Sequence, residues 1–458
     1  MVLSFDTLSK NVVEAKYAVR GEIVQLAQEL ADKGQEMVFM NIGNPQELGQ
    51  KPLTYAREIM AMLHYPQLLE KKEISSLFSQ DNIDRARIIL KKNPLGLGAY
   101  TQSAGIPFVK QAVADFISTR DNIPTDAKNI FLTDGASKGV DMVLQTFITN
   151  HKDGVMIPIP QYPLYSADIR LFGGSQINYY LDEEKNWTLN MEFMQNAYES
   201  AIKEGITPKV LVVINPSNPT GSLLPESDIK EVIGFAEQNN LAIVADEVYQ
   251  ENIYYEGDKF VSFAKIASEK KLDVPLFSLH STSKGFIGEC GYRGGYIEFR
   301  NIPKDIMQVF LKLRSIGLCS NTSGQIMTYL MVQPPKKGEI SYESYINEKN
   351  NILGSLGRKA KALSEGLNKI DGVECQKPRA AMYLFPKLEL PEKDYNGKPA
   401  DFAFCKALVE QAGIVTVPGS GFGQRPGTHH LRMTFLPPEE SVPVVLDKFE
   451  NVYRNFVS

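Results

Sequence analysis

The sequence predicts an α/β protein with a mainly parallel sheet covered by helices on both faces, together with a smaller α+β unit. Two observations carry this prediction. From about residue 128, short runs of β-forming residues alternate with stretches of helical periodicity. Near residues 333–338 the sequence Gln-Pro-Pro-Lys-Lys-Gly ends this alternation, and a different mixture of helix and strand signals follows. The break indicates a boundary between two structural units.

The segment before the alternating region predicts helices separated by loops. Apolar residues from Val13 to Leu30 recur at near-helical spacing, and Gly34 ends the pattern. A loop is expected at residues 41–45, which contain a glycine and a proline. Residues 66–92 are charged and predict a helix that ends at an Asn-Pro pair.

The alternating region supplies the strands of the sheet. The predicted strands are 130–132, 155–157, 210–214, 241–245 and 275–279. Amphipathic helices are predicted between them over 140–148 and 229–236. Beyond residue 340 a charged helix comes first, followed by strand-like and helical stretches at 382–385, 402–409 and 414–417.

The composition is that of a globular protein with two large units. The chain has 458 residues, of which 43% are hydrophobic and 22% are charged, so a disordered or fibrous chain is excluded. With 49 Lys and Arg against 54 Asp and Glu, the net charge is −5, which argues against nucleic acid as a partner. The longest apolar runs are too short to span a membrane.

Cysteine and histidine usage predicts neither disulfides nor a metal site. No two cysteines have CxxC spacing, and the sequence has no HExxH motif. The N-terminal stretch carries Asp6 and Glu14 and lacks the apolar core of a secretory signal. A reducing compartment is the simplest interpretation, so we expect a soluble, cytoplasmic protein. The four cysteines are Cys290, Cys319, Cys375 and Cys405.

Polar side chains gather where the predicted strands end. Asn218, Asp246 and Ser281 each come shortly after a strand-like run, and Lys284 follows Ser281 closely. In an open α/β sheet, ligands bind at the edge formed by the carboxyl ends of the strands. Any one of these residues could be a turn residue or a helix cap. Their convergence on one edge favours a binding site.

The segment Asp-Gly-Ala-Ser at 134–137 lies between a predicted strand and an amphipathic helix. Small residues at a helix N-terminus expose backbone N–H groups at the positive end of the helix dipole, which suits a phosphate. The segment is not a P-loop, because GxxxxGK[ST] is absent. Such a turn is a weak signal by itself.

Lys284 lies in the segment Ser-Thr-Ser-Lys-Gly, upstream of Arg293. A lysine among such small residues is either a solvated loop charge or an amine that forms a Schiff base with a carbonyl cofactor. In the second case Arg293 and Ser281 can hold a phosphate of that cofactor, because a guanidinium binds phosphate through two hydrogen bonds. Asp246 then supplies a carboxylate that faces a pyridinium nitrogen.

These motifs resemble those of the class I and II, fold-type I aminotransferases, which use pyridoxal 5′-phosphate (PLP). The resemblance rests on residues 281–285 with Arg293, on Asn-Pro-Ser-Asn-Pro-Thr-Gly at 215–221, and on Ala-Asp-Glu-Val-Tyr at 245–249. It extends over essentially the whole chain and implies a seven-stranded sheet. A narrower resemblance to the alanine aminotransferase subgroup rests on residues 41–46, 288–296, 319–321 and 419–424, and on the helical stretch 66–92.

The resemblance also implies how the chain is divided. Residues 95–334 are expected to form a large PLP-binding domain. Residues 1–94 and 335–458 are expected to form an N-terminal segment and a small C-terminal domain, so that the second unit is discontinuous.

The resemblance implies a role for each matching residue around the cofactor. Lys284 holds PLP through a Schiff base and moves the proton, and Asp246 pairs with the ring nitrogen. Tyr249 and Asn218 hydrogen-bond the phenolic oxygen of the ring, and Tyr162 stacks on the ring. The phosphate is expected to lie against Ala136, Ser137, Ser281 and Arg293.

The same resemblance assigns the substrate contacts. Arg432 matches the arginine that binds the α-carboxylate, with the backbone of Gly43 and the side chain of Asn218 close to the substrate. Tyr100 matches a tyrosine that reaches the phosphate of the cofactor in the partner subunit, so a homodimer is expected. The implied reaction converts L-alanine and 2-oxoglutarate into pyruvate and L-glutamate by a ping-pong mechanism.

Alternatives remain at this stage. Tyr162 and Tyr100 could pack turns, Tyr249 could be a core residue, and Arg432 could lie on a surface strand; His429 and His430 are taken as structural. A transaminase for aromatic or glyoxylate substrates, or a PLP lyase of the same fold, would share these motifs. A non-catalytic ligand sensor is disfavoured, because the first 95 residues have no basic helix-turn-helix character.

Overall fold

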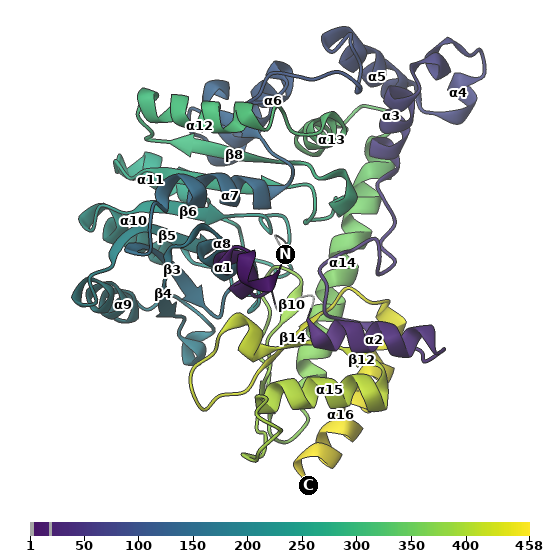
Figure 1. Ribbon diagram of the computed structural model, residues 1–458. Coiled ribbons are helices and arrows are strands. Elements are labelled where there is room, and N and C mark those ends of the chain that lie inside the picture. The colour runs from purple at the N-terminus through teal and green to yellow at the C-terminus, as the bar shows by residue number, and fades with distance from the viewer. Residues whose placement is uncertain (1–3, 18–20) are drawn as a thin grey trace.

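The computed structural model describes residues 4–17 and 21–458. Within these residues the central sheet has seven strands in the order β2-β8-β7-β6-β5-β3-β4 (Figure 1). β8 is antiparallel to both of its neighbours, and the other pairs are parallel. The sheet is thus mainly parallel, as the sequence predicts. In chain order the strands are β2 (Ile130–Leu132), β3 (Asp153–Ile159), β4 (Ser175–Tyr180), β5 (Thr207–Ile214), β6 (Ala242–Asp246), β7 (Leu276–Ser281) and β8 (Gly295–Arg300).

The inner strands are buried on both faces because helices cover both. In β5, Val210 and Val212 pack into the apolar cluster of one face, whereas Leu211 and Val213 pack into the cluster of the other. This alternation follows from the two-residue period of a strand. The first face is covered by α7 (Ala136–Phe147), α8 (Pro163–Phe172) and α12 (Lys304–Ile316). The other is covered by α9 (Met191–Lys203), α10 (Glu226–Gln238) and α11 (Phe263–Lys270), with α6 (Pro107–Asp121) and α13 (Thr322–Val332) near β2 and β8.

A second core joins the N-terminal segment to the C-terminal part of the chain. Ile23 and Ala27 of α2 (Glu22–Asp32) share one apolar cluster with residues from 356 to 453. The strand β1 (Val38–Phe39) pairs in parallel with β12 (Ile414–Val415). The remaining elements of this part are α14 (Tyr342–Leu367), β9 (Val373–Glu374), β10 (Tyr383–Leu384), β11 (Lys387–Leu388), α15 (Ala400–Ala412), β13 (Val417–Pro418), β14 (Leu431–Thr434) and α16 (Val442–Val457).

The long helix α14 connects the two cores. Its first half packs against α3 (Thr54–His64), and its second half contributes Leu356, Leu363 and Leu367 to the C-terminal cluster (Figure 1). The chain therefore passes twice between the sheet-containing part and the C-terminal part. This arrangement accords with a discontinuous second unit, and the domain boundaries at 94/95 and 334/335 remain a prediction.

The structure differs from the predicted elements in three places. The helical pattern between Val13 and Leu30 is divided between α1 (Lys10–Glu14) and α2, and part of the connection, residues 18–20, lies outside the described residues. The helix predicted over 66–92 is broken into a 3₁₀ turn (Pro66–Glu70), α4 (Ile74–Leu77) and α5 (Gln80–Lys92). The strands β4 and β8 were not predicted, because polar residues interrupt their apolar runs. None of the helices described is long and apolar enough to cross a membrane.

Candidate active site

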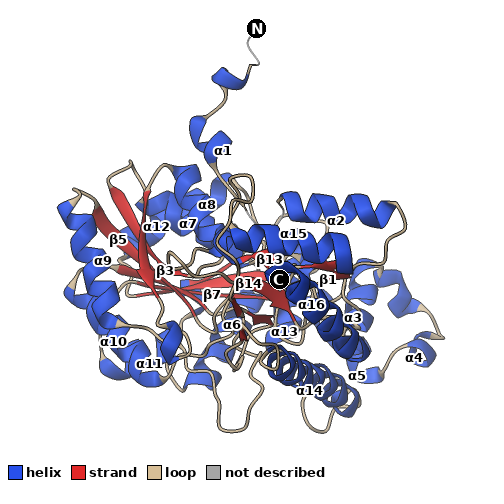
Figure 2. Ribbon diagram, turned by 90° about the horizontal axis from the view of Figure 1, so that it is seen from below, coloured by secondary structure: helices blue, strands red, loops and turns tan. Residues whose placement is uncertain are grey.

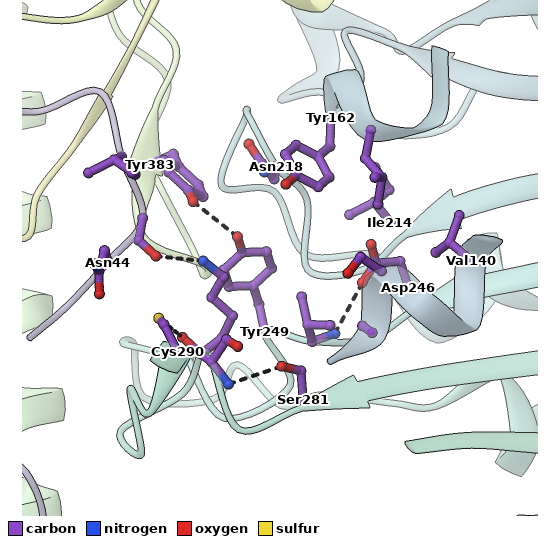
Figure 3. A pocket seen from close by; sticks show the side chains of 18 of the residues that line it. Asn44, Val140, Tyr162, Ile214, Asn218, Asp246, Tyr249, Ser281, Cys290 and Tyr383 are labelled. Atoms are coloured by element: carbon purple, nitrogen blue, oxygen red, sulfur yellow. Dashed lines mark hydrogen bonds between the residues drawn. The ribbon is translucent and has the colours of Figure 1, made fainter. Parts of the chain in front are cut away.

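A cavity of about 620 Å³ lies at the carboxyl edge of β5, β6 and β7, where the sheet faces the C-terminal part of the chain (Figure 3). Its lining comes from segments far apart in the sequence: the loop around Gly43, the start of α7, the strand ends, and β10 and β14. Every site residue predicted from the sequence except Tyr100 lines it. Tyr100 is 78% exposed on the surface of the chain.

Asp246 is the last residue of β6 and is buried at the floor of the cavity. Tyr165 donates a hydrogen bond of 2.9 Å to its Oδ2 atom, and the backbone N–H of Val248 lies 3.4 Å from Oδ1. Burial raises the pKa of Asp246, while these donors and the charge of Lys284 oppose the rise. Among the described residues, no cation forms an ion pair with this carboxylate. It is therefore available to a cationic group of a ligand.

Lys284 enters the cavity just beyond β7. Its Nζ atom donates a hydrogen bond of 2.6 Å to the carbonyl oxygen of Gly43 and lies 5.9 Å from the ring centroid of Tyr249. Gly285 follows with φ of +69°, a conformation that glycine adopts without strain and that turns the chain away at this point. No described carboxylate forms an ion pair with Lys284. Its amine is thus held by a single backbone acceptor inside the cavity.

The start of α7 and Arg293 form an anion seat. Gly135 precedes the helix with φ of +76°, and a Cβ atom there would overlap the guanidinium of Arg293. The Arg293 Nη2 and Nη1 atoms donate hydrogen bonds of 3.1 Å to the carbonyl oxygens of Asp134 and Cys290. Ala136, Ser137, Ser281 and Arg293 all line the cavity. Helix N–H groups and a guanidinium that face one space suit a phosphate.

Arg432 on β14 is buried, with 1% of its surface exposed, so it is not a surface-strand arginine. Nη1 donates a hydrogen bond of 3.1 Å to Oδ1 of Asn218, and Nη2 donates to the carbonyl oxygen of Asn41. The guanidinium carbon lies 4.4 Å from the ring centroid of Tyr383 and 4.6 Å from that of Phe422. Its Nε atom has no partner among the described residues. A buried guanidinium without a carboxylate partner is costly, which favours an anionic ligand here.

Tyr383 on β10 is a site residue that the sequence reasoning missed. The hydroxyl of Tyr249 donates a hydrogen bond of 3.1 Å to the Tyr383 hydroxyl (Figure 3). Burial raises the pKa of Tyr383, but the nearby charges of Lys284 and Arg432 outweigh it and the net pKa is lowered. A Cβ atom at Gly43 would overlap the Tyr383 hydroxyl. The only signal for Tyr383 was its place in a predicted strand.

Tyr162 precedes α8 and points into the cavity, as does Tyr17 from the N-terminal segment. Their hydroxyl oxygens lie 2.7 Å apart, and their rings meet edge to face with centroids 6.3 Å apart. Tyr17 was noted only as part of a helical pattern. Tyr162 lines the cavity, so it is not only a packing residue of the turn before α8.

The charged residues that line the cavity can be compared with the charged groups of PLP and an amino acid. Among the described residues of the lining, Lys284, Arg293 and Arg432 are cationic, and Asp246 is the carboxylate. The excess of positive charge suits a phosphate together with a carboxylate, and the unpaired Asp246 suits a cationic ring nitrogen. The residues present therefore fit PLP with an amino acid. No group of three or more His, Cys, Asp or Glu among the described residues could hold a metal ion.

Comparisons with known proteins decide the family. The family model "Aminotransferase class I and II" matches residues 85–449. The mitochondrial alanine aminotransferase 1 of Arabidopsis thaliana is 46% identical over 473 aligned residues, which cover 99% of this chain and 87% of that protein. The chain belongs to the class I and II aminotransferases. It is an enzyme of this family, and its cofactor is PLP.

Two further proteins are similar to this chain over nearly its whole length. The glutamate–glyoxylate aminotransferase 2 of Arabidopsis thaliana is 44% identical over 465 aligned residues, which cover 100% of this chain and 97% of that protein. The solved structure of an alanine aminotransferase from Pyrococcus furiosus covers 98% of this chain and 100% of its own, with a TM-score of 0.79 and 24% identity. That structure confirms the expected fold.

The comparisons overturn the expected cytoplasmic localisation. The Arabidopsis alanine aminotransferase 1 is named mitochondrial, as are alanine aminotransferases of Dictyostelium discoideum and Saccharomyces cerevisiae that are 43% and 45% identical to this chain. The cytoplasmic assignment was wrong, and the relatives point to the mitochondrion. The four cysteines are all unpaired in the structure. Unpaired thiols do not identify the compartment in which a protein resides.

Behind Asp246, the aminotransferase holds a buried cluster of charges with one more carboxylate than arginines. Arg120 pairs with Asp121 at 2.5 Å, and Arg300 pairs with Glu298 at 2.6 Å, which leaves Glu247 without an ion pair among the described residues. Burial raises the pKa of Glu247 from 4.5 to about 8, although Arg120 opposes the rise. Glu247 therefore binds its proton more tightly in the folded protein than in the unfolded chain.

We expect Glu247→Gln to become progressively more stabilising as the pH rises from about 5 to about 9. Because the pKa of Glu247 is higher in the folded protein than in the unfolded chain, its protonation stabilises the wild-type fold fully below the unfolded pKa. This contribution to the free energy of unfolding is lost as the pH rises through the folded pKa. Glutamine keeps the acceptor for the 2.9 Å hydrogen bond from the Phe263 N–H. The measurement is the free energy of unfolding at each pH, relative to wild type, with the exposed Glu256→Gln as the control. A difference that does not change with pH would show that Glu247 is ionised in the folded protein.

Proposed function

We propose that this aminotransferase transfers the amino group of L-alanine to 2-oxoglutarate and releases pyruvate and L-glutamate. The observation that carries the proposal is the buried, unpaired guanidinium of Arg432, which shares one cavity with Lys284 and Asp246. The choice of alanine is supported by the similarity over nearly the whole chain to proteins named alanine aminotransferase.

PLP would be held by the residues that line the cavity floor. Lys284 supplies the amine that bonds covalently to the cofactor, and Asp246 supplies the carboxylate for its ring nitrogen. Tyr162, Tyr249 and Asn218 line the same cavity and would hold the pyridine ring and its oxygen. The phosphate site is formed by Ala136, Ser137, Ser281 and Arg293.

When bound, PLP supplies a covalent anchor for the amino group and a sink for the electrons released at the substrate's α-carbon. The Nζ atom of Lys284, once free, takes the proton from that carbon and later returns it. Burial raises the pKa of Asp246, while the donors Tyr165 and Val248 N–H oppose that rise and a cationic ring nitrogen beside the carboxylate would oppose it further. An anionic Asp246 keeps a ring nitrogen protonated beside it, which is the state that accepts electrons.

Arg432 would bind the α-carboxylate that alanine, pyruvate, glutamate and 2-oxoglutarate all share. Its side chain is already oriented by Asn218, Asn41 and the ring of Tyr383, so little reorganisation is needed on binding. Gly43 lets the backbone come close to Lys284 at this point. Because one site serves both amino donors, the two half-reactions follow each other in a ping-pong sequence.

Glyoxylate is the second candidate acceptor, because relatives named glutamate–glyoxylate aminotransferase cover 100% of this chain at 44% identity. Glyoxylate also carries an α-carboxylate for Arg432. It has a hydrogen on the carbonyl carbon where 2-oxoglutarate has a carboxyethyl group. Product analysis therefore has to decide between the two acceptors.

The direct test offers the PLP-loaded enzyme L-alanine with 2-oxoglutarate, and in parallel L-glutamate with glyoxylate. We expect pyruvate and glutamate from the first pair at the higher kcat/KM. Lys284→Ala should lose turnover by at least about a thousandfold, since it removes the group that both holds the cofactor and moves the proton. No pyruvate from alanine, or a preference of more than tenfold for glyoxylate as acceptor, would refute the alanine assignment.

We expect Arg432→Lys to raise KM for all four substrates by about ten- to a hundredfold. Lysine keeps the charge but loses the planar pair of donors that matches a carboxylate. Steady-state KM values for the two amino acids and the two oxo acids measure this. Arg425→Lys is the matched control, because Arg425 lies against Tyr180 and Phe193, outside the lining of the cavity. Unchanged KM values for Arg432→Lys would remove Arg432 from the substrate site.

We further propose a homodimer in which Tyr100 reaches the phosphate site of the second subunit. The support is that Tyr100 is 78% exposed and does not line the cavity of its own chain. Sedimentation of the active enzyme should give twice the chain mass of 51.1 kDa. An enzyme that is fully active as a monomer would contradict this proposal.

A further inference from the structure

An aminotransferase that uses both alanine and glutamate meets a charge problem in one cavity. Alanine and pyruvate carry a methyl group where glutamate and 2-oxoglutarate carry a longer side chain that ends in a second carboxylate. The cations among the described residues of the lining are Lys284, Arg293 and Arg432, and the proposed function assigns each of them to another group. A further buried arginine would bind the second carboxylate, but it would be left unpaired whenever alanine is bound.

A pair of neutral donors at the cavity can bind a second carboxylate and leaves no unpaired charge when alanine is bound. Tyr17 and Tyr162 both line the cavity, and their hydroxyl oxygens lie 2.7 Å apart. Each hydroxyl can donate one hydrogen bond and accept others. In this arrangement one hydroxyl donates to the other and one proton stays free. Because Tyr17 is 38% exposed, water can accept that proton when no ligand carboxylate is present. When a carboxylate arrives, the hydroxyl whose proton is not already used can rotate toward it, and the cost of leaving donors unpaired is avoided in both states.

We propose that the hydroxyls of Tyr17 and Tyr162 form the subsite for the side-chain carboxylate of five-carbon dicarboxylate substrates. This inference rests on the proposed function. It makes Tyr17 a specificity-determining residue that acts on glutamate and 2-oxoglutarate and has no partner in alanine or pyruvate.

The N-terminal segment is anchored so that Tyr17 stays over the cavity. The helix α1 lies beside α8 in both views of the chain (Figures 1 and 2) and contacts it. Glu14 of α1 forms an ion pair with Arg170 near the end of α8. Tyr162 immediately precedes α8, so both tyrosines are tied to the same helix. Burial and the contact with Tyr17 raise the pKa of Tyr162 well above its ordinary value, so its hydroxyl stays protonated and remains a donor.

The test compares a ligand that carries a second carboxylate with a shorter one that lacks it. We expect Tyr17→Phe to weaken binding of glutarate to the PLP-loaded enzyme by about ten- to a hundredfold, the effect of losing a hydrogen bond to a charged group. Binding of propionate, which has no second carboxylate, should change by less than about twofold. KM for glutamate and 2-oxoglutarate should rise with the glutarate Kd, and KM for alanine should not. Tyr65→Phe is the matched control, since Tyr65 is 54% exposed and does not line the cavity.

The outcomes separate this inference from the proposed function. Equal weakening of glutarate and propionate would show that Tyr17 only shapes the site, and unchanged glutarate binding would place the second carboxylate elsewhere; either result overturns the inference. If the wild-type enzyme produces no pyruvate from alanine, the proposed function fails. The comparison of glutarate with propionate still tests the subsite in that case, because it needs no turnover.

Discussion

The parallel register of β5, β6 and β7 is the constraint on which the site depends. Ile214 pairs with Asp246, and Asp246 pairs with Leu279, so β5 and β6 end at one level and β7 continues only to Ser281. Because these strands are buried on both faces, apolar residues fill most of their length, and the polar residues of the site come at or beyond their ends. Asn218, Asp246 and Lys284 therefore meet at one edge, although a long stretch of chain separates them. The C-terminal part closes that edge with Arg432 and Tyr383.

The end of β6 also separates two carboxylates that are adjacent in the sequence. Successive residues of a strand point to opposite faces. Asp246 contacts Tyr165, which belongs to the apolar cluster of one face, and Glu247 accepts from the N–H of Phe263, which belongs to the cluster of the other. Asp246 thus faces the cavity with hydrogen-bond donors around it, whereas Glu247 faces a cluster whose arginines are already paired. Burial raises the pKa of both carboxylates, but only Asp246 lines the cavity, where a cationic group of a ligand can pair with it.

Site residues could be predicted from the sequence where binding or catalysis requires particular residue types at the ends of strands. Lys284, Asp246, Asn218 and Arg293 could be predicted because each follows a strong apolar run or a small-residue turn. Tyr383 could not be predicted, since its position depends on β10 approaching Lys284 across the boundary between the two cores. β4 is an edge strand with exposed polar residues, so it has no continuous apolar run. The place of Tyr17 at the cavity depends on how α1 packs against α8, which no local sequence pattern indicates. The cysteine pattern does not identify the compartment.

The central claim is that Lys284, held inside the cavity by the Gly43 carbonyl, carries the cofactor. The most direct measurement treats the PLP-loaded enzyme with borohydride, which fixes a carbon–nitrogen double bond as a stable single bond. Proteolysis and mass spectrometry then locate the added pyridoxyl group. We predict that the group is found on the peptide that contains Lys284 and on no other lysine. An active enzyme whose label lies on a different lysine would contradict the account.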